Sequence, residues 1–146
     1  MRILFLDDNH DRHRIFAENY KGNEIVHVFT ASAAQKALLE SPRFELVSLD
    51  HDLGDFANLN GEPEYWVDDY GRKREFDGQF VAAEVAGLPD ELRPDHVIVH
   101  SVNPEGARRM VQIIERVGIP VRYEPFLSFY AEDDLDAEMF AWEPGA

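Results

Sequence analysis

Short apolar runs alternate along the chain with segments whose apolar residues recur at helical spacing. The runs predict buried strands, because a strand covered on both faces reads as a continuous apolar stretch. We expect strands at residues 3–6, 24–29, 44–49, 96–100 and 119–123. The helical spacing predicts helices at residues 10–20, 31–39, 78–88, 104–117 and 128–139.

Strands that alternate with helices indicate an α/β protein, a doubly wound sheet of five parallel strands with right-handed crossovers. The helix boundaries have clear signals. Thr30, Asp77 and Asn103 stand at N-cap positions, and Gly118 follows the fourth helix, where glycine commonly ends one. The length of 146 residues suits one domain, so we expect residues 1–146 to form a single domain.

The segment 51–77 departs from this alternation. It shows neither helical nor strand periodicity and contains glycine and proline breakers, so we expect a long insertion loop. It also carries several aromatic residues and Arg72-Lys73-Arg74, the only run of three basic residues in the chain. Two interpretations stay open: a lid that stacks on a base and contacts phosphate, or a hydrophobic flap over the sheet edge.

The formal net charge of −15 disfavours broad binding to duplex nucleic acid. Solubility alone explains such a charge, yet a small anion or an RNA end could bind where divalent cations or a local basic patch reverse the local field. The absence of cysteine excludes disulfides and thiolate metal sites. The apolar run at the N-terminus is too short for a signal peptide or a membrane span, so we expect a soluble cytoplasmic protein.

Polar residues gather where the predicted strands end. In a parallel sheet the carboxyl ends of the strands share one edge, and ligands bind there. The residues that follow these ends are Asp7, Asp8, Asp50, His51, Asp52, His100, Ser101 and Asn103. We therefore expect the functional site at this edge.

Asp7, Asp8 and Asp50 are candidate ligands of a divalent metal, Mg²⁺ or Mn²⁺, because three converging carboxylates repel one another without a cation. The alternative is that Asp7 and Asp8 only cap the first helix. His51 and His100 are candidates for acid and base catalysis, with Asp52 orienting one imidazole. The alternative for His100 is a structural, hydrogen-bonded histidine.

A phosphate group has further candidate partners. Ser101, Asn103 and Gly106 lie where the fourth helix begins, and the free N–H groups of a helix N-terminus favour an anion. Arg12 and His13, in the first turn of the first helix, could reach the same phosphate. A solvated helix face is the alternative for these two residues.

The pattern of residues that follow the predicted strands resembles that of the response-regulator receiver domain. The likeness rests on the acidic pair Asp7-Asp8, on Asp50, on Ser101 and on Pro125-Phe126. It implies a receiver, or flavodoxin-like, fold with strand order 2-1-3-4-5. Receivers have a lysine before that proline, where this chain has Glu124.

Three motifs resemble a divergent branch more closely, the cyclic-phosphate processing receiver family. They are LDD followed by Arg12 and His13, LDHDLG at 49–54, and HSVNPEG at 100–106. This resemblance implies a hydrolytic or phosphate-handling role on cyclic phosphate ends. Together with the candidate metal ligands and histidines, it leads us to expect a metal-assisted phosphoesterase whose partner is a nucleotide or an RNA end with a cyclic phosphate. The alternatives are a binding module without catalysis and, last, a phosphorelay receiver. The oligomeric state stays open.

Overall fold

The structure is a computed structural model, and it describes residues 1–40, 42–53, 65–67, 69–75 and 77–126. The five strands of the main sheet are β1 (Arg2–Leu6), β2 (Glu24–Val28), β3 (Leu46–Leu49), β6 (His96–Val99) and β7 (Val121–Tyr123). The helices are α1 (His10–Asn19), α2 (Ala31–Glu40), α3 (Gly78–Ala86) and α4 (Pro104–Glu115), with a 3₁₀ turn at Asp90–Leu92. Two further short strands, β4 (Tyr65–Val67) and β5 (Lys73–Glu75), form a separate antiparallel pair.

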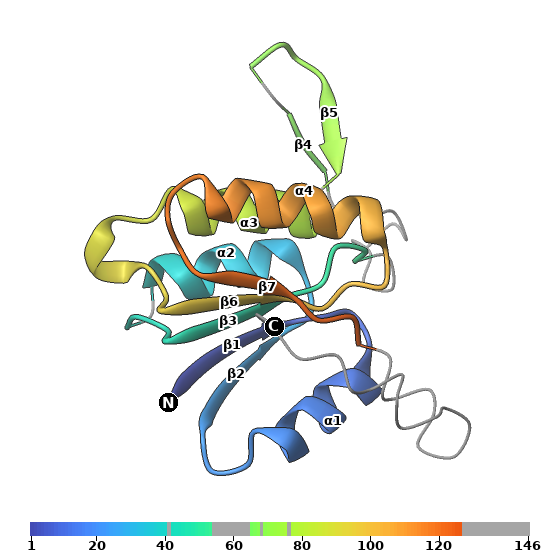
Figure 1. Cartoon of the computed structure of the whole chain (residues 1–146). Coiled ribbons are helices and arrows are strands. Elements are labelled where there is room, and N and C mark those ends of the chain that lie inside the picture. Colours follow the sequence, from blue (N-terminus) through green and yellow to red (C-terminus); the bar gives the residue numbers. More distant parts are fainter. Residues whose placement is uncertain (41, 54–64, 68, 76, 127–146) are drawn as a thin grey trace.

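The five strands form one parallel sheet in the order β2-β1-β3-β6-β7. Counted along the chain, this is the predicted order 2-1-3-4-5, and the predicted fold class is confirmed. Figure 1 shows α2, α3 and α4 covering one face of the sheet and α1 lying against the other. The carboxyl ends of the strands meet at the edge where α1, α3 and α4 begin.

Side chains alternate across the sheet, as the strand period of two requires. From β1, Leu4 and Leu6 enter the large core beneath α2, α3 and α4, whereas Ile3 and Phe5 enter a smaller core against α1. All four side chains are fully buried. Which core a residue enters therefore depends on its parity along the strand.

The predicted helix signals at three N-termini are confirmed. Thr30 Oγ1 accepts a hydrogen bond from the N–H of Ala33, and Asp77 Oδ1 accepts one from Phe80. Asn103 caps α4 in the same way. Gly118 has a φ of +80°, the left-handed conformation that glycine adopts readily and that commonly ends a helix. Among the described residues, no helix combines the length and apolar character needed to cross a membrane.

The prediction that 51–77 lacks regular structure is wrong at two places. β4 and β5 are each three residues long, too short to show an alternating pattern in the sequence, and Gly71 between them has a φ of +75°. In Figure 1 this hairpin extends away from the sheet beyond α3 and α4. Strands β3 and β7 each begin two residues later than predicted, and the helix predicted at 128–139 lies outside the described residues.

Candidate functional site

Three polar residues extend the sheet by one position beyond their strands. The N–H of Asp7 donates to Val28, that of Asp50 to Leu6, and that of His100 to Leu49, over 2.9–3.2 Å. Because the backbone stays extended, the alternation of side chains continues past the strand ends. Asp7, Asp50 and His100 consequently lie on the α1 face, and one potential ligand atom from each falls within 4.8 Å of the others.

The imidazole of His100 is held at both nitrogens. Its Nε2 lies 2.9 Å from Oδ2 of Asp7, and its Nδ1 lies 2.8 Å from Oγ of Ser48. A carboxylate only accepts, so Nε2 carries the proton and donates it to Asp7. The ring also stacks on Phe5, with centroids 4.7 Å apart. His100 is therefore fixed in both position and tautomer.

Arg12 lies across the acidic residues of this edge. Its Nε donates to Oδ2 of Asp7 at 2.7 Å, and its Nη2 lies 3.4 Å from Asp8 and 3.6 Å from Asp50. Burial alone would raise the pKa of Asp7, but the hydrogen bonds and charges of His100 and Arg12 outweigh it and lower that pKa to about 2. Asp7 is thus a firmly ionised, fully buried carboxylate.

Asp50 is compensated less well than Asp7. Desolvation and the nearby charge of Asp7 raise its pKa to about 6, although His100, Arg12 and the N–H of His51 act in the opposite direction. Its Oδ1 accepts that N–H at 2.8 Å, while Oδ2 lies beyond hydrogen-bond distance of Arg12. The carboxylates of this edge thus hold more negative charge than Arg12 neutralises.

His51 follows Asp50 directly and therefore lies on the opposite face of the sheet, beside α3 and α4. Its Nδ1 donates to Oδ1 of Asp52 at 2.8 Å. Its ring lies against Gly106, where an added Cβ would be 2.5 Å from two ring carbons. Its buried Nε2 has no hydrogen-bond partner among the described residues, and Oδ2 of Asp77 lies 3.7 Å away.

Ser101 and Asn103 shape the turn into α4. The N–H of Asn103 donates to Ser101 Oγ at 3.1 Å, and Asn103 Oδ1 accepts the N–H of Gly106 at 3.1 Å. One of the free N–H groups expected for a phosphate is therefore occupied by the cap itself. The atoms nearest to the place where a Cβ of residue 106 would lie belong to the His51 ring.

His13 is buried beneath the edge. Its Nε2 lies 2.8 Å from the carbonyl oxygen of Asp7, and its Nδ1 lies 2.7 Å from Nδ1 of His27. Because a carbonyl accepts, His13 Nε2 is the donor, and His27 supplies the proton shared by the two Nδ1 atoms. Burial lowers the pKa of His13 to about 4 and also lowers that of His27. His13 supports the backbone of Asp7 as a neutral imidazole.

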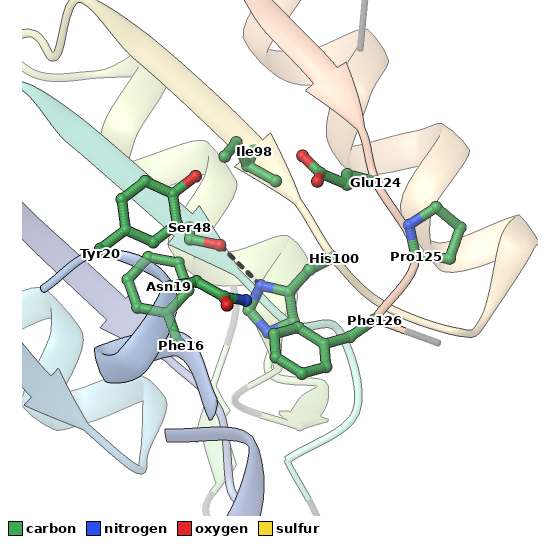
Figure 2. A pocket seen from close by; sticks show the side chains of 9 residues that line it. All are labelled: Phe16, Asn19, Tyr20, Ser48, Ile98, His100, Glu124, Pro125 and Phe126. Atoms are coloured by element: carbon green, nitrogen blue, oxygen red, sulfur yellow. Dashed lines mark hydrogen bonds between the residues drawn. The ribbon is translucent and has the colours of Figure 1, made fainter. Parts of the chain in front are cut away.

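Two cavities meet at His100. The acidic cavity, of about 250 Å³, is lined by Asp8, Asn9, Arg12, Asp50, Asp52, His100, Val102 and Phe126. The rear cavity, of about 70 Å³, is lined by Phe16, Asn19, Tyr20, Ser48, Ile98, His100, Glu124, Pro125 and Phe126. Figure 2 shows the rear cavity, with the bond from Ser48 to His100 as a dashed line.

The structure separates residues that the sequence analysis grouped. Asp8, Asp50, Arg12, Asp52 and His100 line the acidic cavity, with Asp7 buried directly behind them. The other sequence candidates do not line it; they are His13, His51, Ser101, Asn103 and Gly106. The sequence analysis missed Ser48. This residue lies two positions before Asp50 and so on the same face of the sheet, and β6, which leads to His100, is the neighbouring strand. Ser48 therefore lies beside the His100 imidazole.

The strand order, the covering helices and the acidic edge define a receiver-type protein. The chain is similar to the CheY-like receiver domain of a response regulator from Methylobacillus flagellatus (TM-score 0.58, 14% identity, covering 87% of this chain and 86% of that one). It is also similar to the signal receiver domain of a putative Luxo repressor protein from Vibrio parahaemolyticus (TM-score 0.56, 15% identity, 94% and 82% covered).

A third similar structure is a response regulator from Burkholderia pseudomallei with a phosphorylated aspartic acid, a calcium ion and citrate (TM-score 0.55, 17% identity, 86% and 59% covered). Curated proteins provide no match to this chain. The model of the cyclic-phosphate processing receiver domain matches residues 2–116. The chain therefore belongs to the cyclic-phosphate processing receiver domain family.

Proposed function

We propose that this protein is a metal-assisted phosphoesterase that opens a cyclic phosphate on a nucleotide or an RNA end in the acidic cavity. The observation that carries the proposal is the surplus of negative charge beside a fixed imidazole. Asp7, Asp8 and Asp50 converge on a single guanidinium, and His100 lies at the same wall.

The donor set fits a hard divalent cation, which prefers carboxylate oxygens and retains several waters. Asp7, Asp8 and Asp50 would hold it, and it would polarise a phosphoryl oxygen and promote ionisation of the attacking water. Mg²⁺ and Mn²⁺ are the candidates, since an imidazole close to the carboxylates also suits Mn²⁺. The Burkholderia pseudomallei regulator, with its calcium ion, has a similar fold.

Opening a cyclic phosphate breaks a bond between phosphorus and a ribose oxygen, and that oxygen needs a proton. His100 is the proposed donor in its doubly protonated form: transfer of one proton to the ribose oxygen would leave a neutral imidazole, and the ring lines the acidic cavity. Arg12 is the proposed partner of the phosphoryl oxygens. His51 and Asp52 are proposed to shape the cavity wall from the opposite face of the sheet, since only Asp52 of this pair lines the cavity.

The test is incubation of the protein with 2',3'-cyclic nucleotides and Mg²⁺ or Mn²⁺, with product separated by chromatography. We expect His100→Gln to lower turnover by about 10²-fold or more. His96→Gln is the matched control, because His96 is the first residue of β6 and lies at the opposite end of that strand from the carboxyl edge and His100. His51→Ala distinguishes the contribution of the His51 imidazole to turnover from that of His100. Absence of turnover with every cyclic nucleotide and both metals would reject the proposal.

A second candidate is a binding or regulatory module without catalysis, and Glu124 favours it. Glu124 stands where receivers have lysine; its Oε2 accepts from Arg122 Nε at 3.2 Å, and its side chain lines the rear cavity. A carboxylate there would repel a phosphoryl group, which also disfavours phosphorelay signalling through Asp50. This candidate predicts thermal stabilisation by cyclic nucleotides without product.

A further inference from the structure

Arg12 takes the oxygens that a divalent cation would need. Its guanidinium donates to Oδ2 of Asp7 and Oδ1 of Asp8 and lies 3.6 Å from Oδ2 of Asp50, and only 13% of its side chain is exposed. Its backbone is fixed in the first turn of α1, where its N–H donates to the Asn9 side chain at 3.0 Å. The charge of Arg12 therefore lies among the candidate metal ligands.

A guanidinium and a divalent cation cannot both hold the same carboxylate oxygens at full strength, because each donor lone pair serves one partner and the two positive charges repel. Because the carboxylates are buried, solvent screens little of their attraction for either the guanidinium or the divalent cation. Without a ligand in the cavity, Arg12 thus opposes a cation at Asp7, Asp8 and Asp50.

The acidic cavity offers Arg12 another partner. Arg12 lines that cavity, so a short movement of its long side chain would carry the guanidinium toward an anion there. A phosphate oxygen pair matches the planar fork of arginine and forms two parallel charge-assisted hydrogen bonds. A bound phosphate group would then free the carboxylates that Arg12 contacts.

We propose that Arg12 is a built-in competitor of the divalent cation, and that a phosphate group in the acidic cavity relieves this competition by binding Arg12 itself. The cation and the phosphate group consequently bind with positive cooperativity. Thermodynamic linkage makes the effect reciprocal: each tightens the other by the same factor. The inference rests on the cation and phosphate of the proposed function, but it concerns binding and needs no turnover.

The test is calorimetric titration of the full chain with MgCl₂, with and without inorganic phosphate. We expect phosphate to tighten Mg²⁺ binding by about fivefold or more in the wild-type chain. In Arg12→Gln, Mg²⁺ alone should bind more tightly than to the wild type, and phosphate should no longer affect it. Arg14→Gln, an exposed change in the same helix, should behave like the wild type.

A structural role for Arg12 makes the opposite prediction: Arg12→Gln would weaken Mg²⁺ binding. Weaker or unchanged Mg²⁺ binding in that variant, no effect of phosphate on the wild type, or no Mg²⁺ binding to either chain would each overturn the inference. If Arg12→Gln does not fold, Arg12→Lys keeps the charge and loses the planar fork. It should retain the Mg²⁺ affinity of the wild type and lose most of the phosphate effect, and a full phosphate effect would overturn the inference.

The inference and the proposed function can fail separately. Cooperative binding of Mg²⁺ and phosphate without turnover of cyclic nucleotides would reject the catalytic activity and support the role of Arg12. Turnover that is accompanied by independent binding of Mg²⁺ and phosphate would reject the role of Arg12 alone.

Discussion

The hydroxyl of Ser48 lies 2.8 Å from Nδ1 of His100, across two neighbouring strands and on the same face of the sheet. Ser48 is 1% exposed and His100 is 3% exposed, so the hydrogen bond lies in the interior. Because the other ring nitrogen contacts Asp7, the imidazole cannot turn without losing a buried partner. Ser48 thus positions a residue of the candidate site from behind.

Removing this hydroxyl should destabilise the fold. We expect Ser48→Ala to lower the free energy of unfolding by about 1–2 kcal/mol, because a buried ring nitrogen loses its partner. Ser48→Thr is the control: it keeps the hydroxyl, and Ser48 lines the rear cavity. Urea denaturation measures both. Equal stability of the alanine variant and the wild type would show that the hydrogen bond contributes nothing.

Gly106 should not tolerate a side chain. A Cβ there would lie 2.5 Å from carbon atoms of the His51 ring, so we expect Gly106→Ala to cost about 1–3 kcal/mol of stability. Gly87→Ala is a matched control, because its nearest neighbour would be 3.4 Å away. Adding His51→Ala to Gly106→Ala should restore part of the loss, as a double-mutant cycle can measure. Additive losses would contradict the contact.

The neutral His13 predicts a loss of stability in acid. Its pKa is about 4 in the folded chain and 6.5 in the unfolded one, so the unfolded state binds the proton more readily as the pH falls through this window. We expect this histidine to contribute up to about 3 kcal/mol above pH 6.5, lost progressively toward pH 4. Urea denaturation of the wild type and His13→Gln at pH 7 and 4.5 measures it. The difference between the two proteins should shrink at the lower pH; a constant difference would refute the assignment.

Asp50 should have the opposite pH dependence. Its folded pKa of about 6 exceeds the unfolded value of 3.8, so its contribution to stability is present below pH 3.8 and is lost as the pH rises through 6. We expect Asp50→Asn in a chelator to be more stable than the wild type at pH 8 by about 1–3 kcal/mol, and the gain to vanish near pH 4. Stability curves against pH at low salt would measure it. A less stable variant at pH 8 would mean that the carboxylate is well compensated.

The architecture follows from the sequence because its signals are local. Apolar runs, N-cap residues such as Thr30 and Asp77, and Gly118 mark the elements directly, and alternation of strands with helices restricts the topology. The hairpin of β4 and β5 was missed because three residues per strand carry too little periodicity. Its pairing is visible only in the folded chain.

The candidate site is predicted only in part from the sequence. The part that was missed depends on which face of the sheet each residue lies on. Motif reading groups His51 with Asp50 because they are adjacent, yet adjacent residues of an extended chain lie on opposite faces. The same rule, applied to residues two apart, joins Ser48 with Asp50 and brings both beside His100. Contacts that depend on rotamers, such as those of Arg12 with the carboxylates, have no comparable signal in the sequence.

The hydrogen bond from the N–H of Gly78 to the carbonyl oxygen of His51, 2.9 Å long, closes the base of the insertion. The chain thus leaves the sheet and returns to α3 at a single point, beside the candidate site. The two ends are held together by this hydrogen bond, so the fold of the sheet and α3 sets no particular length for the segment between them. A related chain can therefore carry a segment of another length between these two ends while its strands, helices and acidic edge stay the same.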